Sequence, residues 1–141
     1  MNLLPLALLM AATVPPQPSP DLSPDDVVRI VATALRHYNS PTPNAGIYMA
    51  YQFASPANRA ATGPYGHFLG AVKNRDFAAL LHENPEEFGP IVVTNNYAEQ
   101  KVTVHESGGH DVIFTFSLGR QRDGVYRGCW MVDGVGSSLQ H

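Results

Sequence analysis

"YAEQKVTVHESGGHDVIFTFSLGRQ", residues 97–121, holds two runs of alternating apolar and polar side chains on either side of a Ser-Gly-Gly turn. Alternation with a period of two is typical of strands with one buried face, and glycines between two such runs favour a hairpin. Val102 and Val104 share one face of the first run. Phe114 and Phe116 share one face of the second. The stretch therefore predicts a β-hairpin whose apolar face covers a core.

Two more runs extend this hairpin on both sides. "FGPIVVT", residues 88–94, precedes it and ends at an Asn-Asn turn, and "YRGCWMVDGV", residues 126–135, follows it after an Arg-Asp-Gly turn. Runs joined by short turns of Asn, Gly and Asp are typical of an antiparallel meander. We therefore expect a meander of about four strands.

The last of these runs is apolar on both faces. Tyr126, Trp130 and Val132 share one face, whereas Cys129 and Met131 lie on the other. A strand that is apolar on both faces is usually covered on both faces. Helices would cover one face, and a second subunit packed sheet to sheet would cover the other. The pattern predicts a homodimer through the sheet face.

The segment before the strands has helical patterns. Residues 23–38, "SPDDVVRIVATALRHY", begin with an N-cap Ser, a Pro and two Asp, and continue with apolar side chains every three or four residues. Further helices are expected at residues 44–54, 56–61 and 64–74, whereas residues 75–87 fit either a short helix or a strand. Helices followed by a meander predict an α+β fold, with the helices packed on one face of a curved sheet.

Three parts are expected along the chain. Residues 1–13 contain an apolar run that is too short to span a bilayer and has the length of a signal-peptide core, so they predict either a signal peptide or a retained apolar leader. Residues 14–22, "VPPQPSPDL", form an extended Pro-rich spacer. Residues 23–141 form a single globular domain. The leader favours export to a periplasmic, secreted or lumenal location over a cytoplasmic one.

Composition excludes several classes of protein. The 141 residues carry a net charge of −3 with no strongly basic window, so nucleic acid is not an expected partner. A single cysteine, Cys129, excludes an intramolecular disulfide. No transmembrane span, phosphate-binding loop or strong metal motif is found, and we expect no cofactor. We interpret "HESGGHD", residues 105–111, as an exposed hairpin tip rather than a metal site.

Several motifs resemble a known family. "LSPDDVVRIVATAL", "YQFASPANRAATGP", "AVKN" and "RGCWMVDGV" resemble an uncharacterised domain-of-unknown-function family of bacteria, cyanobacteria and plastid-bearing eukaryotes, over about residues 21–135. The order of elements also resembles the nuclear-transport-factor-2-like (cystatin-like) cone fold. That resemblance implies dimerisation through the sheet and a small molecule held between the helices and the sheet. Some proteins of this fold are isomerases, cyclases or dehydratases, and others only bind their ligand. The resemblance to the family of unknown function implies a fold and no catalytic residue.

Three side chains are candidates for acid–base chemistry. Asp133, near the end of the last run, is either a general base with a raised pKa at the mouth of an apolar cone or the first residue of an Asp-Gly turn. His67 has the side chain best suited to proton transfer near neutral pH, and Tyr65 lies two residues before it.

Six further residues are candidates for ligand contacts. Arg59 is the only charged residue between Gly46 and Tyr65, and it either clamps a ligand carboxylate, pairs with Asp133, or donates to carbonyl groups at a helix end. Aromatic side chains either line a pocket or fill the core. These candidates are Tyr48, Tyr51, Phe114, Phe116 and Trp130.

Three functions follow from this interpretation. The first is an exported, homodimeric domain that binds a small apolar or amphipathic ligand or a protein partner. The second is a metal-independent acid–base enzyme, an isomerase, cyclase or dehydratase, that uses Asp133. The third is a structural or assembly factor whose cone is filled by its own aromatic side chains.

Overall fold

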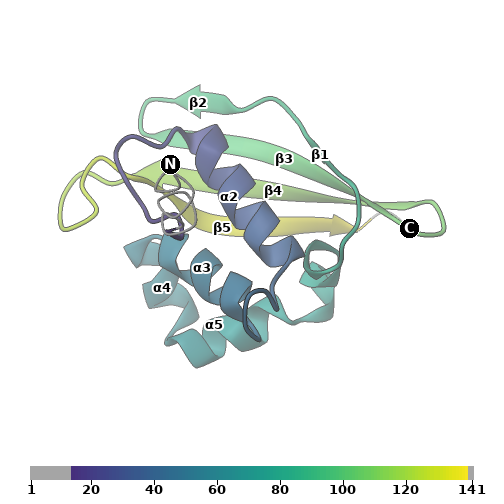
Figure 1. Ribbon diagram of the computed structural model, residues 1–141. Helices are drawn as coiled ribbons and strands as arrows, with labels where there is room; N and C mark the ends of the chain where they lie inside the picture. Colours follow the sequence, from purple (N-terminus) through teal and green to yellow (C-terminus); the bar gives the residue numbers. More distant parts are fainter. Residues whose placement is uncertain (1–13, 140–141) are drawn as a thin grey trace, which may run out of the picture.

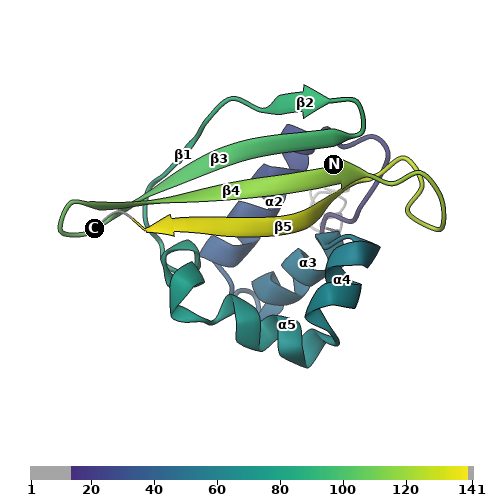
Figure 2. The same cartoon turned by 180° about the vertical axis from the view of Figure 1, so that it is seen from behind.

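Helices cover one face of a five-stranded antiparallel sheet in the computed structural model, which describes residues 14–139 (Figures 1 and 2). The predicted α+β fold, with helices first and the sheet after them, is confirmed. The predicted leader lies outside the described residues. The helical elements are α2 (Pro24–Arg36), α3 (Ala45–Phe53), α4 (Pro56–Thr62), α5 (Tyr65–Val72) and the 3₁₀ helix η1 (Arg75–Leu81). The strands are β1 (Glu86–Phe88), β2 (Val92–Thr94), β3 (Tyr97–Glu106), β4 (His110–Arg120) and β5 (Trp130–Leu139).

Helix α2 begins at a capping box. Ser23 Oγ accepts a hydrogen bond from the backbone N–H of Asp26 at 3.0 Å, and the Ser23 backbone N–H donates to Asp26 Oδ2 at 2.9 Å. Each residue thereby satisfies a helix-end group that would otherwise lack a partner. The helix buries one apolar stripe against the core, formed by Val27, Val28, Val31, Ala32 and Leu35.

Helices α2 and α3 cross very closely at Gly46. The Gly46 backbone N–H donates to the carbonyl oxygen of Tyr38 at 2.8 Å, and the residue is buried. A Cβ built at Gly46 would meet the carbonyl oxygen of Ala34 and would lie 2.7 Å from Tyr38 Cα. Because both neighbours are backbone atoms, only a residue without a side chain allows this approach.

The sheet has the strand order β1-β3-β4-β5, and β2 also pairs with β3. Strand β2 pairs with residues 97–99 of β3 and β1 with residues 102–104, so β1 and β2 together form one interrupted edge. The single strand expected at residues 88–94 is therefore two short ones. Pro90 lies in the interruption and has no N–H to donate to the ladder, which explains the break.

The central hairpin has the predicted faces. Phe114 and Phe116 of β4 are fully buried, and so are Val102 and Val104 of β3. Residues between them in sequence are more exposed, as alternation requires. The core therefore lies between the helices and the face of the sheet that these four side chains occupy.

Gln100 is a buried polar side chain on the same face. Its Nε2 donates to Asp25 Oδ1 at 2.9 Å and to the carbonyl oxygen of Gly89 at 2.8 Å. The Gln100 bond is the main reason why the pKa of Asp25 lies below its ordinary value, and burial partly opposes it. Gln100 thus joins the start of α2, the interrupted edge and β3.

The last strand begins later than expected. Strand β5 starts at Trp130, and Tyr126 lies in the preceding loop, where Gly128 adopts a φ of 83°. The prediction that Tyr126 belongs to this strand is therefore wrong, because the chain turns at Gly128. Residues 129–132 are all buried within the single chain. The predicted coverage of both faces is thus reached without a second subunit.

Strand β5 also contains a β-bulge at Asp133. Ser117 of β4 pairs with Gly134, and the next residue of β4, Leu118, pairs with Val132. Asp133 is the extra residue between these two pairs. A bulge of one residue changes which face the following side chains occupy, and a simple alternation pattern does not reveal it.

Candidate functional site

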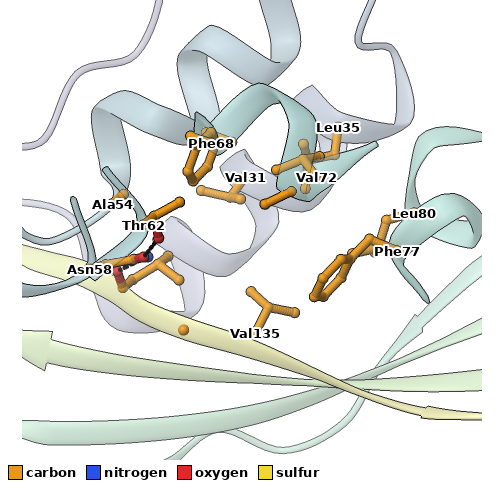
Figure 3. Close-up of a pocket in the computed structure, with 14 residues that line it drawn as sticks. Val31, Leu35, Ala54, Asn58, Thr62, Phe68, Val72, Phe77, Leu80 and Val135 are labelled. Atoms are coloured by element: carbon orange, nitrogen blue, oxygen red, sulfur yellow. Dashed lines mark hydrogen bonds between the residues drawn. The ribbon is translucent and has the colours of Figure 1, made fainter. Parts of the chain in front are cut away.

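A cavity of about 240 Å³ lies between the helices and β5 (Figure 3). Fourteen residues from α2, α3, α4, α5, η1, β5 and the α3–α4 junction line it, and all but two of them are apolar or glycine. Its walls include Val31 of α2, Phe68 of α5 and Phe77 of η1. Ala71 of α5 also lines it and is exposed, so the cavity reaches the molecular surface beside α5. This composition is typical of sites for ligands of low polarity.

The bulge of β5 shapes one wall of the cavity. Val132 and Val135 are three residues apart, and without the bulge they would point to opposite faces of the sheet. The extra residue between them places both on the face that lines the cavity. Residue 135 pairs with buried Phe116, which is consistent with this orientation.

Asn58 and Thr62 of α4 form the polar part of the wall and lie at one end of the cavity, away from Phe77 and Leu80 (Figure 3). Asn58 Nδ2 donates to the carbonyl oxygen of Val132 at 3.0 Å. Thr62 Oγ1 donates to Asn58 Oδ1 at 3.0 Å. The two side chains are therefore ordered by their own contacts before any ligand arrives.

Ser55 fixes the position of α4 against β5. Its buried side chain is the N-cap, with Oγ accepting from the Asn58 backbone N–H at 3.1 Å. Its backbone N–H donates to the carbonyl oxygen of Val132 at 2.8 Å. Since that carbonyl also accepts from Asn58, helix α4 and its polar side chain are held by the same point of β5.

None of the six predicted ligand-binding residues lines this cavity. Phe114 and Phe116 are fully buried core side chains, and Trp130 is buried in the same core cluster. They fill part of the space between the helices and the sheet, but the cavity beside β5 remains open. Phe77 lines the cavity and stacks on Phe114 of this core, with ring centroids 6.3 Å apart.

The predicted tyrosines gather on the helical layer instead. Tyr65 lies edge-on to both Tyr48 and Tyr51, with ring centroids 5.3 Å apart in each pair. Burial, and secondarily the charge of Tyr48, raise the pKa of the Tyr65 hydroxyl. Half of Tyr48 is exposed to solvent. These three rings form an aromatic cluster outside the cavity.

A wide groove of about 1,100 Å³ runs between α2 and α3 next to this aromatic cluster. Tyr48 and Tyr65 line it on the helical side. Pro15 and Pro16 of the Pro-rich spacer line it as well, so part of the spacer lies against the folded domain. The groove is broader and more open than the cavity beside β5.

Arg59 caps the end of α3. Its Nε donates to the carbonyl oxygen of Tyr51 at 3.1 Å, and its Nη2 donates to that of Gln52 at 2.9 Å. The guanidinium carbon lies 4.8 Å from the Tyr51 ring centroid and 5.6 Å from that of Tyr126. The sequence left three roles open for Arg59. These contacts agree with the third, in which Arg59 donates hydrogen bonds to the carbonyl groups at a helix end.

Arg59→Met is expected to destabilise the protein by about 1 kcal/mol, because the two carbonyls lose a charged donor while water can partly replace it. Urea unfolding followed by tryptophan fluorescence measures this change. Arg127→Met, at an exposed loop position, is the matched control and is expected to have no effect. Equal stability of both variants would contradict the capping role.

Asp133 and His67 lie outside the cavity. Asp133 is exposed and lines an open depression on the other face of the sheet, together with Val92 and Tyr97. His67 is exposed on α5. The bulge that turns Val132 and Val135 toward the helices therefore leaves the carboxylate of Asp133 on the outer face. The structure does not bring Asp133, His67 and Tyr65 into one site.

His105 is held between two carboxylates near the hairpin tip. Its Nδ1 lies 2.8 Å from Asp111 Oδ1, and its Nε2 lies 3.2 Å from Glu87 Oε1. The hydrogen bond with Asp111, and then that with Glu87, raise the pKa of His105. Within residues 14–139, no group of three or more His, Cys, Asp or Glu side chains is arranged to hold a metal ion.

Glu86 of β1 was not singled out from the sequence. It pairs with Val104, so its side chain lies on the buried face of the sheet. Burial raises its pKa from the ordinary 4.5 to about 7, although the charge of Arg36 partly opposes this rise. Glu86 Oε2 and Arg36 Nε are both buried without a hydrogen-bond partner among the described residues.

Sequence reasoning also missed Asn58 and Thr62. The Ser55-Pro56 start signal places Asn58 in the first turn of α4, but its side-chain partner lies 74 residues away. No local pattern indicates such a contact. The spacing of four residues between Asn58 and Thr62 indicates only that the two side chains share one face of the helix.

Comparisons with known proteins identify a family for most of the chain. A family model described as a domain of unknown function (DUF4864) matches residues 27–138. No curated protein and no solved structure matches the chain. The resemblance to the nuclear-transport-factor-2-like cone therefore stays a prediction. Within the described range, no helix combines the length and apolarity needed to cross a membrane.

Proposed function

The chain belongs to this family of unknown function, and on that premise we propose that it binds a small apolar or amphipathic ligand in the cavity beside β5. The observation that carries the proposal is the cavity itself, with about 240 Å³ of space, apolar walls and one ordered polar pair. Protein interiors are close-packed and hold few voids larger than a water molecule. A void of this size with its polar groups at one end supports a binding role.

The volume limits the ligand to a small molecule. A cavity of roughly 150 Å³ binds benzene, with six non-hydrogen atoms, so one of this size has room for about nine or ten. Such a ligand is expected to bind with a Kd on the order of 100 µM, because small ligands have few atoms with which to offset the loss of motional freedom. The proposal assigns no role to Asp133, His67 or Tyr65.

Two further predictions from sequence belong with this proposal. A sheet-face homodimer is tested by sedimentation at micromolar concentration, where a strictly monomeric mass would rule it out.

Export is tested by sequencing the mature N-terminus, since a chain that begins at Met1 or Asn2 would argue against a cleaved signal peptide.

Toluene is expected to bind the wild-type cavity and to fail in the variant Val135→Phe, because a larger side chain on β5 occupies the space of the ligand. Titration is followed by the methyl resonances of Val31, Leu35 and Val72, which line the cavity. The expected loss of affinity is at least about tenfold, since a filled pocket cannot accept the ring without displacing the core.

Val125→Phe is the control for this titration, because Val125 is 93% exposed and does not line the cavity. It adds the same aromatic group without reaching the cavity. Saturable shifts of the three cavity methyl groups in wild type and in Val125→Phe, but not in Val135→Phe, support the proposal. Shifts that do not saturate, or that persist in Val135→Phe, would refute binding at this site.

A further inference from the structure

We infer that the ligand of this cavity is a neutral alcohol with its hydroxyl group at the Asn58–Thr62 end and a hydrocarbon body of about eight or nine carbons toward η1. This inference rests on the proposed function and specifies its ligand. Three properties of the cavity support it, namely its charge, its hydrogen-bonding groups and the placement of those groups.

No charged side chain is among the fourteen residues that line this cavity within the described part of the chain. A carboxylate or ammonium group would therefore lose its water without gaining an opposite charge. Asp133 lies between the lining residues Val132 and Gly134 in sequence, but its carboxylate is on the other face of the sheet. The cavity accordingly selects a neutral molecule over the corresponding acid or amine.

The hydrogen bonds of Asn58 and Thr62 leave one N–H donor on Asn58 and acceptor lone pairs on Asn58 Oδ1 and Thr62 Oγ1. Asn58 Nδ2 uses one of its hydrogens for the carbonyl oxygen of Val132 and retains the second. Thr62 Oγ1 gives its proton to Asn58 Oδ1 and retains its lone pairs. A ligand hydroxyl matches both, since it accepts from Asn58 and donates to Thr62. A ketone or ester oxygen only accepts and matches the first alone.

The shape of the cavity sets the direction of the ligand. The polar pair lies at one end, and the aromatic ring of Phe77 with Leu80 lies at the other (Figure 3). Between them the wall is formed by aliphatic side chains such as Val31, Val72 and Val135. A hydroxyl at the terminus of the molecule therefore reaches the pair while the hydrocarbon stays away from it.

The test compares 1-octanol, 2-octanone, octanoate and toluene by the same methyl NMR titration of the full chain. In wild type, 1-octanol is expected to bind about five- to tenfold more tightly than 2-octanone, the value of one additional hydrogen bond, and octanoate is not expected to bind. In the double variant Asn58→Leu/Thr62→Val, which removes both polar side chains of the pair, the octanol preference is expected to disappear. Thr62→Ser keeps the hydroxyl and is expected to keep the preference.

The outcomes separate the inference from the proposed function. If toluene and 2-octanone bind as tightly as 1-octanol, or if the double variant keeps the preference, the alcohol assignment is wrong and the ligand site stands. Binding of octanoate at the cavity methyl groups would overturn the assignment of a neutral ligand. If none of the four probes gives saturable shifts, the proposed function itself fails.

Discussion

Gly46→Ala is expected to destabilise the protein by about 3 kcal/mol or more, near the upper end of what overpacking costs. The added methyl group would meet the Ala34 carbonyl oxygen and Tyr38 Cα, which are backbone atoms of α2 and its C-terminal extension. Side chains can rotate away from such a contact, but a backbone cannot. The two helices must therefore separate, and the hydrogen bond from Gly46 to Tyr38 lengthens with them.

Gly66→Ala is the matched control, because Gly66 also lies in a helix and a Cβ there would have nothing within 4 Å. It is expected to stabilise the protein by about 0.5–1 kcal/mol, since Ala restricts the unfolded chain more than Gly does. Urea unfolding of both variants measures the difference. A Gly46→Ala protein as stable as wild type would show that the helices do not cross as closely as described.

Glu86→Gln is expected to stabilise the protein by about 2 kcal/mol at pH 8 and to have little effect at pH 4. The pKa of Glu86 is raised to about 7 in the folded state, from an ordinary 4.5. Below the lower value, the carboxyl is protonated in both states. Between the two values, the unfolded chain releases the proton and the folded chain keeps it, so stability falls as the pH rises.

Above a pH of about 7, Glu86 is ionised in both the folded and the unfolded state, and the full penalty of the buried charge remains. A shift of this size corresponds to roughly 3 kcal/mol, and the partial exposure of the group reduces it to about 2. Gln has nearly the shape of Glu but no charge, so it removes the penalty.

Unfolding free energies of wild type and Glu86→Gln between pH 4 and pH 8 measure this effect. Glu99→Gln, at an exposed position of β3, is the control and is expected to give no such divergence. Parallel stability curves for wild type and Glu86→Gln would show that Glu86 is ionised in the folded state as readily as in the unfolded chain.

Local patterns predicted most of the fold. The capping signals at Ser23 and Ser55 mark the starts of α2 and α4, and the alternation of apolar residues assigns the faces of β3 and β4. These features depend on residues within a few positions of each other, so the sequence displays them directly. The start of β5 was placed four residues early because apolar residues continue through a loop that turns at Gly128.

The candidate site depends on contacts that no local pattern carries. The bulge at Asp133 is visible only in the pairing of two strands, and it decides that Val135 faces the cavity and Asp133 does not. Asn58 acquires its role from a carbonyl 74 residues away. Aromatic content instead drew attention to Phe114, Phe116 and Trp130, which fill the core. The role of Arg59 became clear only from its hydrogen bonds to the carbonyl groups at the end of α3.

The break at Pro90 affects the tendency of this protein to aggregate at high concentration. An uninterrupted edge strand offers a row of free backbone groups to which a second chain can add, and this is a common start of aggregation. Here the edge consists of two three-residue strands with Pro90 between them, although Val92 and Val93 are exposed. At the opposite edge, the Ser55 N–H already donates to the Val132 carbonyl. We therefore expect strand addition to be unfavourable at the interrupted edge and at the part of β5 that contacts the start of α4.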